Sequence, residues 1–288
     1  MSTIAAAPSL VRHISDTSLW AAAFRARENS REDALFRDPF AARLAGPRGF
    51  EIANTLSTES HGTSWITRTF LFDRFITAEI ARGVDVMVNL GAGLDTRPYR
   101  MKLPLSLLWV EVDAPGIIAY KEELLARETP TCMVERIGLD LTDAKARRTL
   151  LANFAQKGRN ILVVTEGVLI YLKARDVASL ASELVSEPGF KSWILELASP
   201  HVLNTMQRTA GEPLRQAGAC FQFPPMEGPS FFEPYGWHAV ETQSVLKTAV
   251  ELGRTPIDPK LSPLIPNLPL DGPKSMPWIG VCRFTRQQ

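Results

Sequence analysis

The sequence predicts an α/β fold in which a mostly parallel, doubly wound sheet carries helices on both faces. From residue 84 onward, short apolar runs alternate with amphipathic stretches, which is the pattern of βαβ units. The apolar run 86–90 ends in two glycines separated by one alanine, and a second run ends in Asp113, twenty residues after Gly93. Both features are typical of strand ends at the carboxyl edge of a parallel sheet, where open α/β folds bind ligands.

Residues 1–83 carry helical patterns, and we expect them to form an extension packed on a core of residues 84–288. The expected boundaries follow from residues that suit helix ends. Asp38 is suited to cap a helix whose first residue is Pro39, and Gly46 is expected to stop it. The three helices expected here are 16–30, 39–46 and about 64–82.

Beyond residue 84 the expected elements alternate between strand and helix. The expected strands are 86–90, 107–112, 132–139, 161–166, 192–198, 237–241 and 278–284. The expected helices are 114–127, 142–157, 173–186 and 244–252. The stretch 255–277 contains seven prolines. We expect a rigid irregular excursion there, and a polyproline ligand for a partner is the alternative.

The segment 199–235 interrupts this alternation directly after the fifth expected strand. It contains basic residues and several phenylalanines. Because it follows the carboxyl end of a strand, it can fold over the ligand site as a lid that shapes a substrate pocket. The alternative is a helix and loop that only cover the edge of the sheet.

The composition excludes several classes of function. With 32 basic and 31 acidic residues, the chain lacks the excess of positive charge that is typical of proteins that bind nucleic acid or an anionic membrane. No apolar run approaches the roughly 20 residues that span a bilayer, and no secretory signal is apparent. The three cysteines are widely spaced, which predicts reduced thiols and a cytoplasmic protein. No metal is expected, because no cluster of His, Asp or Glu has ligand spacing.

The glycine turn at 91–93 predicts a ligand that contains a nucleoside. Asp113, at the tip of the neighbouring strand, can bind both hydroxyls of a ribose. A dinucleotide fingerprint needs a third glycine, and Thr96 stands at that position. Asp95 lies where phosphates would be, and a carboxylate there repels a pyrophosphate but tolerates a cation. S-adenosylmethionine, which has a ribose, a sulfonium and no phosphate, is therefore favoured over NAD.

Four further positions are candidates for the same site. Arg68 precedes the first strand and can pair with a carboxylate of the ligand, unless it is a solvated surface charge. Asp140 can accept from an adenine amino group while Leu141 packs on the ring; alternatively, Asp140 caps the next helix. Glu166 closes the fourth strand and is expected to point into the ligand crevice. Tyr171 is expected to line the pocket or to belong to the core.

These motifs resemble the leucine carboxyl methyltransferase family, and more closely its bacterial branch of S-adenosylmethionine-dependent and polyketide O-methyltransferases. The resemblance rests on 89–97, 111–113, 140–141 and 166–172, with N-terminal motifs at 16–20, 26–28 and 33–39. It implies the class I methyltransferase fold, which is Rossmann-like, with a seven-stranded, mostly parallel sheet and an antiparallel strand at 278–284. With the turn residues, it implies that the cofactor is bound by Arg68, Gly91, Ala92, Gly93, Asp113, Asp140, Leu141 and Glu166.

The expected function is S-adenosylmethionine-dependent methyl transfer to a carboxylate or hydroxyl oxygen of a small molecule. We find no motif in 199–235 that recognises a protein C-terminal leucine. A carboxylate needs no base, whereas a phenol or enol benefits from one. His201 is the best-placed base, unless it has a structural role, and Tyr171 is the second catalytic candidate. The alternatives are an NAD-linked oxidoreductase and a non-catalytic cofactor-binding protein.

Overall fold

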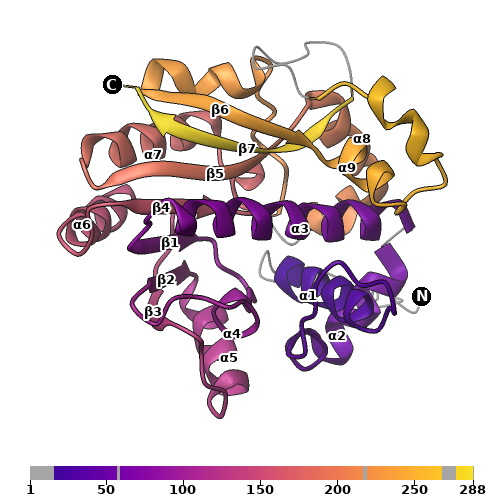
Figure 1. Ribbon diagram of the computed structural model, residues 1–288, viewed down its shortest axis with the longest axis horizontal. Helices are drawn as coiled ribbons and strands as arrows, with labels where there is room; N and C mark the ends of the chain where they lie inside the picture. Colours follow the sequence, from indigo (N-terminus) through magenta and orange to yellow (C-terminus); the bar gives the residue numbers. More distant parts are fainter. Residues whose placement is uncertain (1–15, 57–58, 217–218, 268–276, 288) are drawn as a thin grey trace, which may run out of the picture.

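A seven-stranded sheet runs through the middle of the molecule (Figure 1). The computed structural model describes residues 16–56, 59–216, 219–267 and 277–287. Its strands are β1 Val86–Leu90, β2 Leu108–Asp113, β3 Met133–Gly138, β4 Ile161–Thr165, β5 Phe190–Ala198, β6 Trp237–Ser244 and β7 Ile279–Arg286. They lie in the order β3-β2-β1-β4-β5-β7-β6, and β7 is antiparallel to both of its neighbours. The expected fold class and the antiparallel last strand are therefore confirmed.

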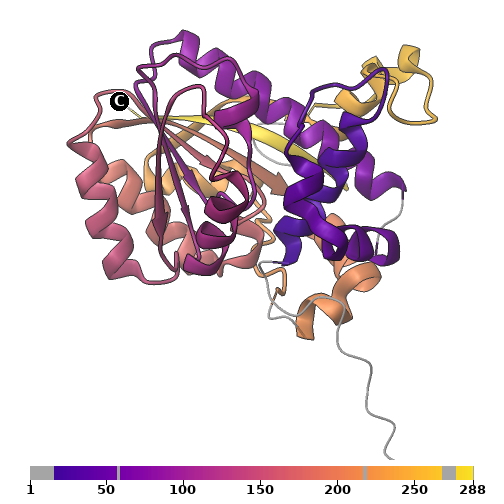
Figure 2. The ribbon, with the colours of Figure 1, turned by 90° about the horizontal axis from the view of Figure 1, so that it is seen from below.

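Helices connect the strands and cover both faces of the sheet. The α-helices are α1 Asp16–Asn29, α2 Ala41–Leu56, α3 Glu59–Ala81, α4 Arg97–Arg100, α5 Pro115–Leu125, α6 Ala144–Ala155, α7 Ala174–Ser186, α8 Pro200–Gln216 and α9 Val245–Glu251. Three 3-10 helices are η1 Leu169–Tyr171, η2 Gly228–Tyr235 and η3 Pro259–Leu264. Figure 2 shows α3 on one side of the sheet and the helices that follow β3 and β4 on the other.

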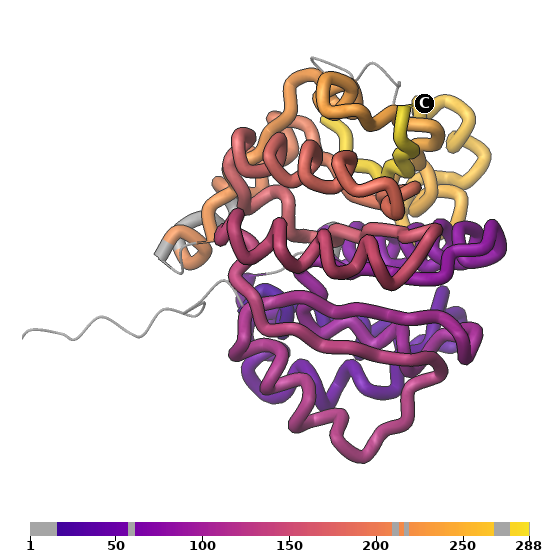
Figure 3. The backbone as a smooth tube through the Cα atoms, turned by 90° about the vertical axis from the view of Figure 1, so that its left-hand side faces the viewer, coloured from indigo at the N-terminus to yellow at the C-terminus, as the bar shows by residue number. Residues whose placement is uncertain are grey.

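The central strands are buried on both faces, which explains why their sequences are continuous apolar runs. Val88 of β1 belongs to a cluster with Phe154 of α6 and Leu180 of α7. Its neighbour Met87 points to the opposite face and clusters with Phe72 of α3. The alternation along one strand thus anchors helices on both sides, and the parallel strands keep their carboxyl ends at one edge. In the side view of Figure 3, α6 and α7 lie in front of α3.

Two expectations about the N-terminal helices are wrong. The helix expected to stop at Gly46 only breaks there, at φ 55°, and resumes as far as Leu56. Pro47 makes this possible, because proline suits the first turn of the new helical segment. The third helix begins at Glu59 and so includes Gly62. A Cβ at Gly62 would lie 3.0 Å from the Phe24 ring, so this glycine lets α3 approach α1 closely.

The segment 199–235 divides into two parts. Residues 200–216 form α8, which follows β5 at the carboxyl edge of the sheet. Leu214 of α8 belongs to the same apolar cluster as Trp20 of α1 and Leu44 of α2. The later part instead packs into the core, where Phe232 contacts Trp193 at 5.3 Å between ring centroids. In the proline-rich stretch, η3 is a short 3-10 helix, and residues 268–276 lie outside the described residues. No helix in the described ranges is long and apolar enough to cross a membrane.

Candidate active site

A cavity of about 950 Å³ lies at the carboxyl edge of the sheet, between the strand ends and helices α1, α3 and α8. Ligand pockets range from about 300 to 1,000 Å³, so this one has room for two small molecules at once. The structure brings every candidate residue of the sequence to its wall. These are Arg68, Gly91, Ala92, Gly93, Asp113, Asp140, Leu141, Glu166, Tyr171 and His201.

The glycine turn and Asp113 form one hydrogen-bonded unit. Gly93 N–H donates to Asp113 Oδ2 at 2.6 Å, and Ala114 N–H donates to Oδ1 at 2.6 Å. Burial raises the pKa of Asp113, and these two backbone donors oppose the rise. Gly91 has φ 73°, and a Cβ there would lie 2.8 Å from the side chain of Val168. The glycine is therefore required by the chain itself, before any ligand is considered.

The residue in place of a third glycine connects the turn to the N-terminal helices. Thr96 is fully buried and donates from Oγ1 to Asp38 Oδ2 at 2.7 Å. The same oxygen accepts from Arg25 Nε at 2.8 Å, and Arg25 Nη2 donates to the Leu94 carbonyl at 2.6 Å. The helix that follows, α4, is a single turn. The turn is thus followed by these hydrogen bonds and a single helical turn, whereas a dinucleotide site has a long helix at this position.

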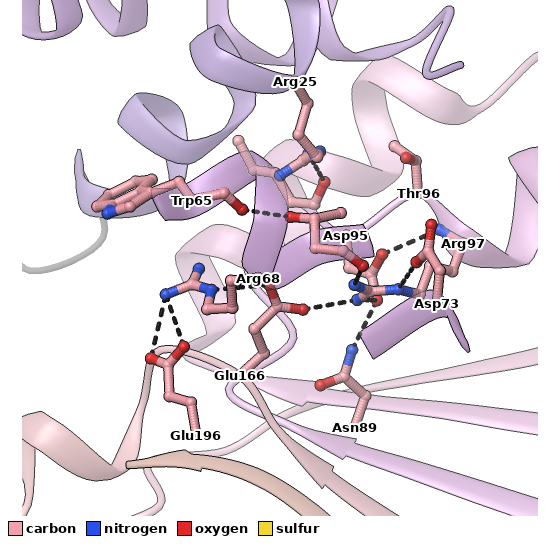
Figure 4. A network of polar contacts seen from close by, with 12 residues as sticks. Arg25, Trp65, Arg68, Asp73, Asn89, Asp95, Thr96, Arg97, Glu166 and Glu196 are labelled. Atoms are coloured by element: carbon pink, nitrogen blue, oxygen red, sulfur yellow. Dashed lines mark hydrogen bonds and ion pairs between the residues drawn. The ribbon is translucent and has the colours of Figure 1, made fainter. Parts of the chain in front are cut away.

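The structure corrects the expectation that the carboxylate of Asp95 would repel a ligand that contains phosphates. Its carboxylate pairs with Arg97 at 3.0 Å and accepts from Asn89 Nδ2 at 2.9 Å (Figure 4). Burial alone would raise the pKa of Asp95, but Arg97 and other cations lower it to about 2. Asp95 is therefore ionised and already neutralised by a neighbour. Its charge alone does not select the ligand.

Arg68 is not a solvated surface charge, because its side chain is only 13% exposed. Its Nε lies 3.0 Å from Glu166 Oε1, and its Nη1 lies 2.9 Å from Glu196 Oε2 (Figure 4). The other oxygen of Glu166 lies 2.8 Å from Arg97 Nη1. Glu166 therefore bridges two arginines, and a continuous charged chain runs across the floor of the cavity.

Glu196 is the functional candidate that the sequence reasoning missed. It lies near the end of β5, its side chain lines the cavity, and it is 5% exposed. Burial raises the pKa of Glu196, while Arg68 opposes the rise. The available signal was a single carboxylate in the run 193–198, whose other residues are apolar. The sequence reasoning also missed Arg97, which pairs with Glu166 and with Asp73 behind the wall, and the separate pair of Arg25 with Asp38.

Asp140 makes a tight turn and does not cap the next helix. Its Oδ1 accepts from the N–H and the hydroxyl of Thr142, at 2.8 and 2.7 Å. The cap of α6 is Asp143, which accepts from two N–H groups of the first turn. The capping alternative for Asp140 is therefore wrong. Asp140 is exposed at the rim, and Leu141 beside it is half-buried.

The two catalytic candidates differ in burial. His201 is exposed on the first turn of α8. Burial raises the pKa of Tyr171 to about 12, so its phenol stays protonated at neutral pH and cannot act as a base. Its ring lies 5.6 Å from that of Phe221. Among the described residues, no group of three or more His, Cys, Asp or Glu is placed to hold a metal ion.

Comparison with known proteins gives the family. Residues 18–185 match the model of the leucine carboxyl methyltransferase family. An S-adenosyl-L-methionine-dependent methyltransferase, by name, of Frankia alni is 30% identical over 252 residues, covering 83% of this chain and 88% of the relative. One of Streptomyces coelicolor is 29% identical over 254 residues, covering 83% and 87%.

Two solved structures share the fold at low sequence identity. A DUF574 family protein of Streptomyces avermitilis has a TM-score of 0.64 at 13% identity, covering 97% of this chain and 99% of its own. A Thermobifida fusca protein named as a methyltransferase has a TM-score of 0.57 at 17% identity, covering 99% and 100%. With the family match and the named relatives, the chain belongs to the leucine carboxyl methyltransferase family and is an S-adenosylmethionine-dependent methyltransferase.

Proposed function

We propose that the protein transfers a methyl group from S-adenosylmethionine to an oxygen of a small molecule. The observation that carries this proposal is the charge of the cavity wall. Its described residues include five carboxylates and three arginines, a balance that favours a ligand bearing a sulfonium and an ammonium. The carboxylates are Asp95, Asp113, Asp140, Glu166 and Glu196, and the arginines are Arg25, Arg68 and Arg97.

The residues fit the parts of this cofactor. Asp113 is held by two backbone donors and would bind the ribose hydroxyls, as its place at the end of β2 suggests. Glu166 and Arg68 would bind the methionyl ammonium and carboxylate by charge-assisted hydrogen bonds. Leu141 and Asp140 at the rim would contact the adenine. When bound, the cofactor supplies an activated methyl group, and the protein has chiefly to align the acceptor oxygen with it.

Calorimetry with S-adenosylhomocysteine tests the cofactor site. The wild-type protein is expected to bind, and Asp113→Ala to bind about a hundredfold more weakly, because it loses charge-assisted hydrogen bonds to the ribose. Asp176→Ala on α7, a partly exposed aspartate outside the cavity, is the matched control. If the wild type fails to bind, or if Asp113→Ala binds equally well, this assignment of the site is wrong.

A further inference from the structure

The order of the strand ends divides the cavity into two ends. Along the carboxyl edge the strands follow as β2, β1, β4 and β5. Asp113, the glycine turn, Glu166 and Glu196 follow in the same order. A nucleoside held at Asp113 therefore leaves the β5 end to the acceptor. Glu196 is the carboxylate that stands there (Figure 4).

The wall around the β5 end is apolar and partly aromatic. The Phe221 ring lies against Tyr171, and this wall is held in place by the Gln222 N–H, which donates to the Ile170 carbonyl at 2.7 Å. Such a surface suits a flat apolar molecule. The apolar residues lining this end include Ile170, Ala198, Leu203, Met206, Phe221 and Ile279.

A carboxylate acceptor finds no unpaired arginine among the described residues of the wall. Arg25 pairs with Asp38, and Arg97 pairs with Asp73, Asp95 and Glu166. Arg68 is shared between Glu166 and Glu196, and in the proposed function its remaining donors bind the methionyl carboxylate of the cofactor. An anionic acceptor would meet the two glutamates and be repelled, whereas a hydroxyl group can donate a hydrogen bond to one of them.

We propose, on the basis of the proposed function, that the acceptor is a phenol with an apolar body and that Glu196 accepts its hydroxyl proton. The proton moves from the phenol oxygen to a carboxylate oxygen of Glu196. The phenol oxygen forms a bond to the methyl carbon, whose bond to sulfur breaks. The electron pair of that bond stays on the sulfur, which becomes a neutral thioether.

Glu196 suits this role better than Glu166. Each oxygen of Glu166 faces a different arginine, at 3.0 and 2.8 Å. Both oxygens of Glu196 share the single Nη1 of Arg68, at 3.1 and 2.9 Å, and the buried Oε2 accepts no hydrogen bond of good geometry. Burial also raises the pKa of Glu196, which favours it as a proton acceptor.

A matched pair of probes tests the acceptor class. Calorimetry compares 2-naphthol with 2-naphthoate, each titrated into protein saturated with S-adenosylhomocysteine. The naphthol is expected to bind at least about tenfold more tightly, since the naphthoate meets uncompensated carboxylates. Equal binding, tighter naphthoate binding or no binding of either overturns the acceptor class. If S-adenosylhomocysteine itself does not bind, the proposed function fails instead.

The role of Glu196 is tested by comparing two phenols of different acidity. With 2-naphthol at pH 8, Glu196→Gln is expected to lower kcat about a hundredfold, the size of a lost general base. With 4-nitrophenol, which is ionised at that pH, kcat is expected to stay within about threefold of the wild-type value, because no proton remains to be removed and the variant no longer repels the anion. Glu135→Gln, a surface carboxylate paired with Lys157, is the matched control.

Three outcomes overturn the role of Glu196. The first is an equal loss with both phenols, and the second is a loss confined to His201→Gln. The third is a Glu196→Gln variant that binds S-adenosylhomocysteine as weakly as Asp113→Ala, since Glu196 would then serve the cofactor. Should Glu196→Gln fail to fold, Glu196→Asp keeps a base. It is expected to show the same contrast between the phenols with a smaller loss.

Discussion

The two ends of the cavity are built in different ways. At the β2 end, two neighbouring strand ends form one hydrogen-bonded unit, in which Gly93 N–H donates to the carboxylate of Asp113, twenty residues away, at 2.6 Å. At the β5 end, the wall is assembled from distant segments, with Phe221 lying against Tyr171 and Glu196 facing Arg68 from another element. The proposed ribose site is therefore encoded by strand and turn geometry, whereas the Arg68–Glu166 pair and the proposed acceptor end depend on tertiary packing.

The largest loss of stability is expected when the glycine turn that supports Asp113 is disrupted. In Gly91→Ala, the new Cβ lies 2.8 Å from Val168 at a backbone φ of 73°. Left-handed strain and the clash together are expected to lower the free energy of unfolding by about 3 kcal/mol. Urea denaturation measures this loss. Calorimetry is expected to show weaker binding of S-adenosylhomocysteine, because the turn is displaced.

Alanine substitutions at two other glycines distinguish the cost of backbone strain from the cost of the contact with Val168. Gly253 has φ 65° with nothing within 4 Å of a new Cβ, so alanine there is expected to cost about 1 kcal/mol from strain alone. Gly116 lies in the first turn of α5 with open space around it, and alanine there is expected to be neutral or stabilising. Equal losses at all three positions would show that contact with Val168 contributes nothing.

The same difference between the two ends explains what the sequence could predict. The run 86–90 was predicted to the residue, because a strand buried on both faces and ended by glycine leaves a continuous local signal. The partners of Arg68 were not predictable, since Glu166 and Glu196 lie 98 and 128 residues away in the chain. Spacing along the sequence indicates which carboxylates reach the sheet edge, but ion pairing depends on how the sheet and α3 are packed.

A smaller loss of stability is expected when Asp95, which pairs with Arg97 in the charged chain, is replaced by asparagine. Asp95 has a folded pKa of about 2, below its ordinary 3.8, so its ionised form stabilises the folded state above pH 3.8. This contribution is about 2 kcal/mol and is lost as the pH falls from 3.8 through 2. Asp95→Asn is therefore expected to be less stable than the wild type at pH 7, with the difference disappearing near pH 2.

Urea denaturation of both proteins across this pH range measures that difference directly. Asp176→Asn is the matched surface control, since its carboxylate is partly exposed on α7. A difference between wild type and Asp95→Asn that stays constant down to pH 2 would contradict the role of the Arg97 pair. It would leave the neutral hydrogen bond from Asn89 as the source of the stability.

The smallest change in free energy is expected from Phe221→Ala. This variant tests whether acceptor binding can be weakened without a change in cofactor binding. The ring contributes an aromatic contact to the acceptor end, so 2-naphthol is expected to bind about tenfold more weakly, a loss of about 1.4 kcal/mol. The affinity for S-adenosylhomocysteine is expected to stay within about twofold, because the backbone bond from Gln222 still holds the wall.

Phe231→Ala is the matched control within the same segment, because Phe231 packs on Phe223 in the core and does not line the cavity. It is expected to lower stability without changing naphthol binding. If Phe221→Ala instead weakened both ligands equally, the acceptor wall would also be shaping the cofactor end. The charged chain from Glu196 through Arg68 to Glu166, which continues to Arg97 and Asp95, would then be the first connection between them to test.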